Sequence, residues 1–324
     1  MQLRPLLFRP VYKDYLWGGG KIASRFGRTG VPSPCAESWE VSAHPDGMSV
    51  VEGGDFAGAA LAALCEEHGA ALLGSWCEGN RFPLLVKLID ASRDLSVQVH
   101  PNDANAARTG GEPKTEAWYF LETEPGATVC AGLKEGVGPR IFEDAVKEKR
   151  VASLLRNVPA VAGKSLYIPG GLVHAIRAGC FVLEVQQSSN TTYRVYDWDR
   201  VGADGKPREL HVRQAVRTID WKFGGMDLST PVPMHAAAPG NKRERLIRSD
   251  YFTLERFTLA APEPMVADGT SFKVLFAAAG GLVLRDGAGE TEVPAGRSCL
   301  VPASLGEYSV EPAGASATVL CAGL

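Results

Sequence analysis

A short alternating run around His100 constrains the fold of this chain more than any other segment. In residues 95–101 (LSVQVHP), two valines alternate with Gln98 and His100. Successive side chains of a strand point to opposite faces, so a strand here would place Gln98 and His100 on one face. Glu116 follows in KTEAW, and His174 closes PGGLVH. Two imidazoles, a carboxylate and an amide oxygen can hold a divalent metal with an open position. The sequence therefore predicts a metal held inside a β-barrel.

The overall charge and hydropathy describe an ordinary globular protein. Of 324 residues, 45% are hydrophobic and 22% are charged, and the formal net charge is -3. This balance argues against nucleic acid or an anionic membrane surface as a partner. Apolar runs such as residues 83–86 are too short to span a bilayer, and the first 15 residues lack the apolar core of a signal peptide. We therefore expect neither a nucleic-acid nor a membrane partner.

The cysteines indicate a reducing compartment. Seven of them occur, an odd number, and none forms a CxxC pair. Reduced thiols in a cytosol explain this pattern better than a disulfide framework. We expect a cytoplasmic protein.

Short apolar or alternating segments recur between turn residues, which predicts a mainly β fold. The segments in the first part of the chain are 82–90, 95–100, 116–122, 164–168, 181–187 and 192–197. Two stretches, 55–68 and 141–156, have helical spacing. Residues 228–242 are rich in Pro and Ala and resemble a linker. Short strands resume beyond it, at 251–259, 272–277, 281–285, 298–302 and 317–322, in a region that contains no histidine.

Residues 163–174 have the form G-x5-P-x-G-x2-H, which resembles the second motif of the cupin superfamily. Ala178 stands where many cupins have Asn. The segment from Gln98 to His100 resembles the first cupin motif, with Gln in place of its first His. Glu116 would be the carboxylate of that motif, displaced by an insertion at 103–112.

Several longer motifs narrow the resemblance to type I mannose-6-phosphate isomerases of the short bacterial form. They occur in order over roughly residues 12–215: YLWGG (15–19), ESWE (37–40), 95–102, KTEAWY (114–119), 167–174 and QQSSNTTYRVYDW (186–198). The resemblance implies two cupin-like jelly-roll β-barrel domains. Residues 1–240 would form a catalytic metal-binding domain with helical insertions, and residues 241–324 a small metal-free one.

The resemblance also implies the site. One zinc ion per chain would be held by Gln98, His100, Glu116 and His174. Arg194 and Lys114 would be catalytic, and Lys87 and Glu184 would bind substrate. Pro113 departs from longer family members, which have a His beside the lysine, and this leaves Lys114 as the better candidate for proton transfer. Ser96 shares the inward face with Gln98 and is a candidate donor to the substrate phosphate.

These residue types suit the interconversion of mannose 6-phosphate and fructose 6-phosphate through an enediol(ate). A metal polarises the carbonyl, and a permanently charged Arg194 can neutralise negative charge but cannot readily act as the base. Lys114 could be the base only if neighbouring cations depress its pKa. Alternatives are a cupin isomerase of another phosphosugar, a non-catalytic sugar-phosphate-binding cupin, which would not need Arg194 and Lys114, and a cupin dioxygenase, which usually has more His ligands. The chain could be a monomer or a homodimer.

Overall fold

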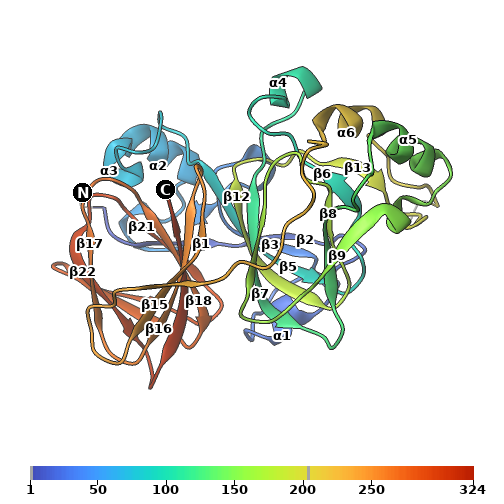
Figure 1. The fold of residues 1–324 in the computed structure, drawn as a ribbon. Coiled ribbons are helices and arrows are strands. Elements are labelled where there is room, and N and C mark those ends of the chain that lie inside the picture. The colour runs from blue at the N-terminus through green and yellow to red at the C-terminus, as the bar shows by residue number, and fades with distance from the viewer. Residues whose placement is uncertain (1–2, 203–204) are drawn as a thin grey trace.

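The fold is a stack of four β-sheets with helices at one end (Figure 1). A computed structural model describes residues 3–202 and 205–324 of the chain. From right to left in Figure 1, the layers are a pair of helices, a five-stranded sheet, a six-stranded sheet, an eight-stranded sheet and a four-stranded sheet. The predicted mainly β fold is confirmed. None of the helices in the described residues has the length and apolar character needed to cross a bilayer.

The five- and six-stranded sheets form what we call the first sandwich. The six-stranded sheet contains, in spatial order, β10 (Ser165–Ile168), β7 (Glu116–Thr123), β12 (Cys180–Gln187), β5 (Leu84–Ala91), β3 (Glu37–Ser42) and β2 (Val11–Lys13). The five-stranded sheet contains β13 (Tyr193–Tyr196), β6 (Val97–Val99), β11 (His174–Ile176), β8 (Thr128–Leu133) and β9 (Leu155–Pro159). An apolar cluster that includes Trp118, Val182 and Val129 joins the two sheets.

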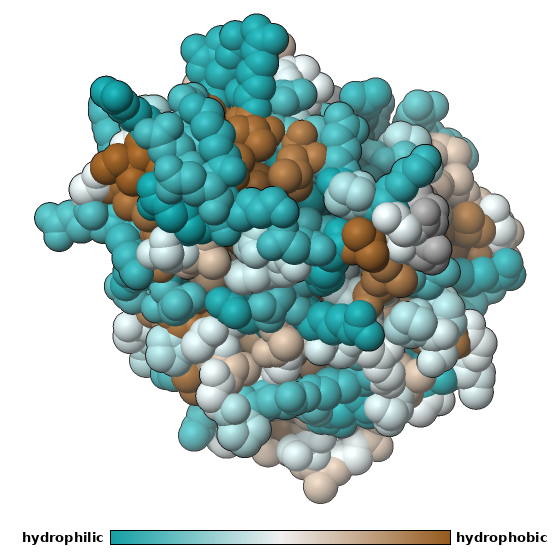
Figure 2. Space-filling view, turned by 90° about the vertical axis from the view of Figure 1, so that its right-hand side faces the viewer, coloured by the Kyte–Doolittle hydropathy of each residue, from teal (hydrophilic) through white to brown (hydrophobic). Residues whose placement is uncertain are grey.

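Helices cover the outer face of the five-stranded sheet. Helix α5 (Pro139–Lys147) and helix α6 (Val212–Thr218) bury Phe142 and Ala215 against Val97 and Val99. Those valines point away from the first sandwich interior, as the alternation in residues 95–101 predicts. Figure 2 shows this end of the molecule, which is mainly hydrophilic with separate apolar patches.

The eight- and four-stranded sheets form the second sandwich. The eight-stranded sheet contains β14 (Val232–Met234), β15 (Lys242–Arg248), β16 (Thr253–Leu259), β23 (Ala317–Gly323), β18 (Lys273–Ala279), β21 (Ser298–Val301), β1 (Leu6–Arg9) and β4 (Val50–Val51). The four-stranded sheet contains β17 (Glu263–Ala267), β22 (Gly306–Pro312), β19 (Leu282–Asp286) and β20 (Gly289–Val293).

The two sandwiches share a large apolar core. Val86 and Leu88 of β5 pack in one cluster with Val274 and Phe276 of β18. Helix α2 (Leu61–His68) and helix α3 (Ala70–Leu73) also contribute to it. Strand β5 is therefore buried on both faces, which explains why its sequence reads as a nearly continuous apolar run.

The first strand of the chain belongs to the second sandwich. Leu6 of β1 pairs with Leu300 of β21, so the sheet joins segments from both ends of the sequence. The predicted boundary near residue 240 stays a prediction.

Both predicted helices are present but shorter than expected. The stretch 55–68 contains a 3-10 turn (Gly54–Phe56) and then α2, because Gly58 adopts a φ of +86° that a continuous helix cannot contain. In 141–156, α5 ends near Lys147 and a 3-10 turn (Val151–Leu154) follows. The remaining helices are α1 (Lys21–Ser24), α4 (Ala106–Thr109) and a 3-10 turn (Pro45–Gly47).

Candidate active site

Three predicted metal ligands meet inside the first sandwich. His100 follows β6, Glu116 begins β7 and His174 begins β11. One ligand atom from each lies within 4.8 Å of the others, and all three side chains are buried. Strand pairing brings them together, because His174 is the partner of Gln98 in the β6–β11 ladder.

The ring nitrogens of the two histidines point toward one another. Nδ1 of His174 lies 2.9 Å from the carbonyl oxygen of Leu172, so it donates there and leaves the Nε2 lone pair facing the cluster. That Nε2 is 3.2 Å from Nε2 of His100. Burial, together with Lys114, lowers the pKa of His100 to about 3, and burial lowers the pKa of His174. Both rings are therefore neutral, the form that binds a metal.

Lys114 and Gln98 connect this cluster to the solvent-accessible pocket. Nζ of Lys114 is 2.9 Å from Oε2 of Glu116 and 3.1 Å from Nε2 of His100. Nε2 of Gln98 is 3.3 Å from Nε2 of His174. Burial raises the pKa of Glu116, but Lys114 and the two histidines lower it further, so that it lies well below its usual value. Glu116 is a carboxylate in this environment.

A second lysine is held between two acids beside the cluster. Nζ of Lys87 lies 3.0 Å from Oε1 of Glu184 and 3.3 Å from Oε1 of Glu37. Burial lowers the pKa of Lys87, but the two carboxylates raise it above its usual value, so the amine stays charged. Burial, and then the negative charge of Glu116, raise the pKa of Glu184.

Two tryptophans orient these carboxylates. The indole Nε1 of Trp39 donates to Oε2 of Glu37 at 2.8 Å, and that of Trp118 donates to Oε2 of Glu184 at 2.8 Å. Both rings are almost completely buried. Each ring therefore packs in the interior and also fixes the position of a carboxylate.

The donor set fits a divalent metal. Neither carboxylate oxygen of Glu116 has a hydrogen-bond donor in good geometry among the described residues. The network around it contains three carboxylates (Glu37, Glu116 and Glu184) and two ammonium groups (Lys87 and Lys114). It therefore carries one surplus negative charge that a cation would balance. Two neutral imidazoles, a carboxylate and an amide are a nitrogen- and oxygen-rich set of the kind that holds zinc.

A cavity of about 390 Å³ opens above this cluster. Six predicted site residues line it: Ser96, Gln98, Lys87, Lys114, Glu184 and Arg194. His100, Glu116 and His174 are not part of the lining but are in contact with Lys114 and Gln98, which are. Nε of Arg194 donates to Oγ of Ser96 at 3.2 Å, and its Nη1 donates to the carbonyl oxygen of Glu209 at 3.1 Å. Burial, and then the charge of Arg208, lower the pKa of Arg194.

The cavity contains polar residues that the sequence did not reveal as site residues. They are Tyr15, Glu37, Asn190, Thr192, Arg208 and His211. The sequence could have indicated Glu37, because it lies in the ESWE motif and shares one face of β3 with Trp39. Arg208 and His211 had no such signal, because they follow a segment without strand or helix periodicity.

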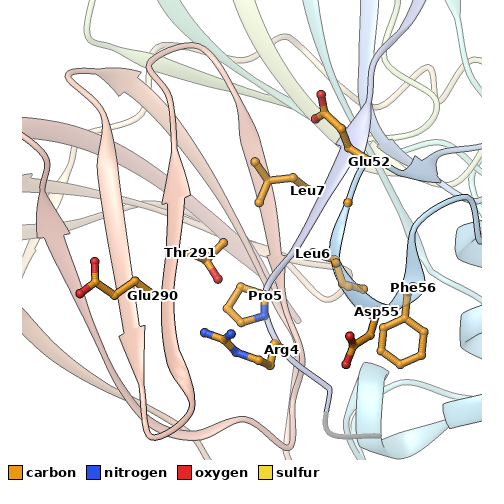
Figure 3. Close-up of a pocket in the computed structure, with 11 residues that line it drawn as sticks. Arg4, Pro5, Leu6, Leu7, Glu52, Asp55, Phe56, Glu290 and Thr291 are labelled. Atoms are coloured by element: carbon orange, nitrogen blue, oxygen red, sulfur yellow. The ribbon is translucent and has the colours of Figure 1, made fainter.

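A second cavity of similar size, about 410 Å³, contains none of the predicted site residues (Figure 3). It lies between β1, the segment around Asp55 and β20. Asp55 and Phe56 form one wall, and Glu290 and Thr291 the other. Arg4 lies between them, and its Nε is 3.2 Å from Asp286. Within the described residues, no metal-type cluster other than that of His100, Glu116 and His174 is present.

Comparison with family models gives two matches. Residues 6–126 match a model described as phosphomannose isomerase type I, catalytic domain. Residues 242–320 match a model described as mannose-6-phosphate isomerase, cupin domain.

Individual relatives agree. The chain is 42% identical to mannose-6-phosphate isomerase ManA of Bacillus subtilis over 222 residues, which are 68% of this chain and 69% of the relative. It is 34% identical over 311 residues to the probable mannose-6-phosphate isomerase GmuF of the same organism, covering 95% and 96% of the two chains.

A solved mannose 6-phosphate isomerase from Bacillus subtilis superposes with a TM-score of 0.90 at 30% identity and covers 99% of both chains. A mannose 6-phosphate isomerase solved with bound zinc and yttrium shares the fold at 17% identity, with a TM-score of 0.75 and 99% of both chains covered.

Proposed function

The chain belongs to the type I phosphomannose isomerase family, and on that premise we propose that the cavity inside the first sandwich is its active site. The enzyme interconverts mannose 6-phosphate and fructose 6-phosphate. One observation carries the placement: His100, Glu116 and His174 converge beneath a cavity that Lys114 and Arg194 line.

The enzyme is metal-dependent, and we propose one zinc ion per chain, held by Gln98, His100, Glu116 and His174. The neutral imidazoles and the surplus negative charge of the network support this, and one protein of the same fold binds zinc. A bound divalent ion would polarise the sugar carbonyl and stabilise negative charge on its oxygens.

Arg194 and Lys114 are proposed to be the catalytic residues. Moving a proton between C2 and C1 places negative charge on the substrate oxygens, and a fixed guanidinium stabilises such charge because it needs no reorganisation. Ser96 and the Glu209 carbonyl hold the Arg194 guanidinium in place. Nζ of Lys114 lies 2.9 Å from Glu116 Oε2 and 3.9 Å from Glu184 Oε1, so two carboxylates hold the amine beside the cavity.

Ser96, Lys87 and Glu184 are proposed to bind substrate. All three line the cavity. The Ser96 hydroxyl is oriented by Arg194, and Lys87 and Glu184 form an ion pair in the cavity lining, where it could bind sugar hydroxyls. The buried pair would hold a hydroxylated ligand without changing its own charge.

We further propose that each sandwich is a cupin-like jelly roll, with a catalytic unit over 1–240 and a small metal-free unit over 241–324. The family models support this, because the cupin-domain model begins at residue 242. Strand β1 then crosses to the second unit and fastens the two together. We propose a cytoplasmic enzyme, a monomer or a homodimer, in keeping with seven free thiols of which six are buried.

A coupled assay tests this function. Purified enzyme should convert mannose 6-phosphate with a divalent metal present, and a chelator should stop turnover reversibly. Glucose 6-phosphate, assayed in parallel, separates a mannose enzyme from a cupin isomerase of another phosphosugar. Tight binding of mannose 6-phosphate without turnover in metal-loaded protein would instead indicate a non-catalytic sugar-phosphate-binding cupin.

A further inference from the structure

A single buried carboxylate organises two arginines, one of which lines the active-site cavity. Asp197 directly follows β13 and is 6% exposed. Its Oδ1 accepts from Nη2 of Arg200 at 2.5 Å. The same carboxylate accepts from Arg208 twice, from Nε to Oδ2 at 2.8 Å and from Nη2 to Oδ1 at 2.5 Å. Burial raises the pKa of Asp197, but the two arginines lower it further, so the group stays charged.

The two arginines occupy different positions relative to the active site. Arg208 lines the active-site cavity, together with Arg194, Ser96 and His211. Arg200 is absent from that lining and borders only a neighbouring cavity of about 250 Å³, which Arg208 also borders. The same carboxylate therefore holds one guanidinium at the active site and one beside it.

This end of the cavity has a surplus of positive charge. Three guanidinium groups (Arg194, Arg200 and Arg208) lie around one carboxylate. Among the ion pairs that the structure describes, none joins Arg194 to an acid. The cluster around Glu116, which Gln98 and Lys114 of the cavity lining contact, carries a surplus negative charge. The cavity is thus suited to a molecule with an anion at one end and neutral oxygens at the other.

The geometry of Arg208 leaves donors for such an anion. A guanidinium has five N–H groups in a planar fork, and Asp197 engages only its Nε and Nη2 edge. Its Nη1 edge has no partner in the described hydrogen bonds. Phosphate oxygens match this fork, and charge-assisted bonds of this type are the strong ones.

We propose that Arg208 binds the phosphate group of the phosphosugar and that Asp197 is the positioning residue that aims it. The inference rests on the proposed function, whose catalytic end lies at the metal cluster. The two arginines then have separate tasks. Arg194 acts on the reacting oxygens, and Arg208 selects phosphorylated over unphosphorylated sugar. Asp197 thereby contributes to substrate recognition through Arg208, whereas Arg200 does not line the active-site cavity.

The test compares the two arginines that share Asp197. Arg208→Ala should raise KM for mannose 6-phosphate by about 10- to 100-fold, with kcat almost unchanged, because a charged hydrogen bond to the ground state and transition state alike is lost. The inhibition constant of inorganic phosphate should rise in parallel. Arg208→Lys should restore part of the loss. The matched control, Arg200→Ala, should change either constant by less than about 3-fold.

Asp197→Asn tests the positioning role. It should raise KM and the phosphate inhibition constant less than Arg208→Ala does, and it should add nothing in an Arg208→Ala background, because its effect passes through Arg208. Circular dichroism and the unfolding midpoint of each variant check that the fold is retained.

Several results would overturn the proposal. In active enzyme, unchanged KM and phosphate inhibition in Arg208→Ala would remove Arg208 from phosphate binding. Equal losses in Arg200→Ala and Arg208→Ala would indicate that the loop structure matters and not a phosphate contact. Wild-type protein without activity would count against the proposed function alone. Calorimetric binding of inorganic phosphate to wild type and Arg208→Ala would still decide the role of Arg208.

Discussion

The interior of the first sandwich holds charged side chains, whereas the interior of the second holds almost only apolar ones. In the first, Lys87 is buried between Glu37 and Glu184. In the second, the eight-stranded sheet contributes Leu275, Cys299 and Cys321 and the four-stranded sheet contributes Leu284 to one apolar cluster. Both sandwiches have the same architecture, two antiparallel sheets packed face to face. The architecture alone therefore does not determine whether the interior can carry out a reaction.

The comparison shows what a polar interior requires. An unpaired buried charge is very costly, and the buried Lys87 and Lys114 of the first sandwich each lie beside a carboxylate. The second sandwich needs no such network. Its outer face instead supplies the apolar surface that covers β5 and its neighbours. One sandwich supplies the chemistry, and the other supports the sheet that carries it.

The largest expected difference concerns matched pairs of interior residues. His100→Ala with His174→Ala should remove bound metal and reduce turnover to the detection limit, because two of the proposed ligands are lost. Cys299→Ala with Cys321→Ala alters the corresponding interior of the second sandwich and should leave metal content and turnover unchanged. Metal analysis and the coupled assay measure both. Full activity in the histidine double variant would refute the assignment of the metal site.

Breaking the charge network should cost stability in the first sandwich only. Lys87→Met leaves Glu37 and Glu184 buried without their common partner, and loss of one member of a buried ion pair costs about 3–5 kcal/mol. Urea unfolding of the metal-free protein measures the loss. Lys273, which belongs to none of the ion pairs described in the structure, is the control in the second sandwich. If Lys273→Met were equally destabilising, the contrast between the two interiors would fail.

Arg194 should affect turnover and not stability. Removing one preorganised donor to developing negative charge typically costs about 10²- to 10³-fold in kcat, or about 3–4 kcal/mol. Arg194→Ala should show this loss with KM and metal content little changed, and Arg194→Lys should restore part of it. Steady-state kinetics against mannose 6-phosphate provide the measurement. A raised KM with kcat preserved would assign Arg194 to ground-state binding, the role proposed for Arg208.

The metal cluster could be predicted from the sequence because local patterns contain it. Alternation in residues 95–101 places Gln98 and His100 on one face, and the Pro-Gly turn before His174 starts a strand at the ligand itself. Eleven of the 23 strands that the structure describes were also predicted, because apolar alternation and turn residues delimit them. The assignment of individual site roles stays a prediction.

Other features depend on contacts that no local pattern records. Asp197 holds the guanidinium of Arg208, and that ion pair joins positions eleven residues apart that share no strand or helix. Likewise, Leu6 pairs with Leu300 through packing between opposite ends of the chain. Strand β15 was missed because its sequence, KRERLIR, is mostly charged, and its pairing with β16 stabilises it as a strand.

The smallest expected effect is a gain in stability within the second sandwich. The hydroxyl of Tyr308 is buried in the apolar cluster and has no hydrogen-bond partner among the described residues. Burial raises the pKa of this phenol above its usual value, because the cluster cannot solvate a phenolate. An unsatisfied buried polar group costs about 1–3 kcal/mol, so Tyr308→Phe should raise the free energy of unfolding by about 1 kcal/mol without changing kcat.

The comparison variant in the first sandwich is Glu184→Gln. It removes a carboxylate that is paired with Lys87, and it should therefore lower the free energy of unfolding. Chemical denaturation of both variants measures the opposite signs. Destabilisation by Tyr308→Phe would mean that the hydroxyl has a partner, and the second interior would then also depend on a satisfied polar group.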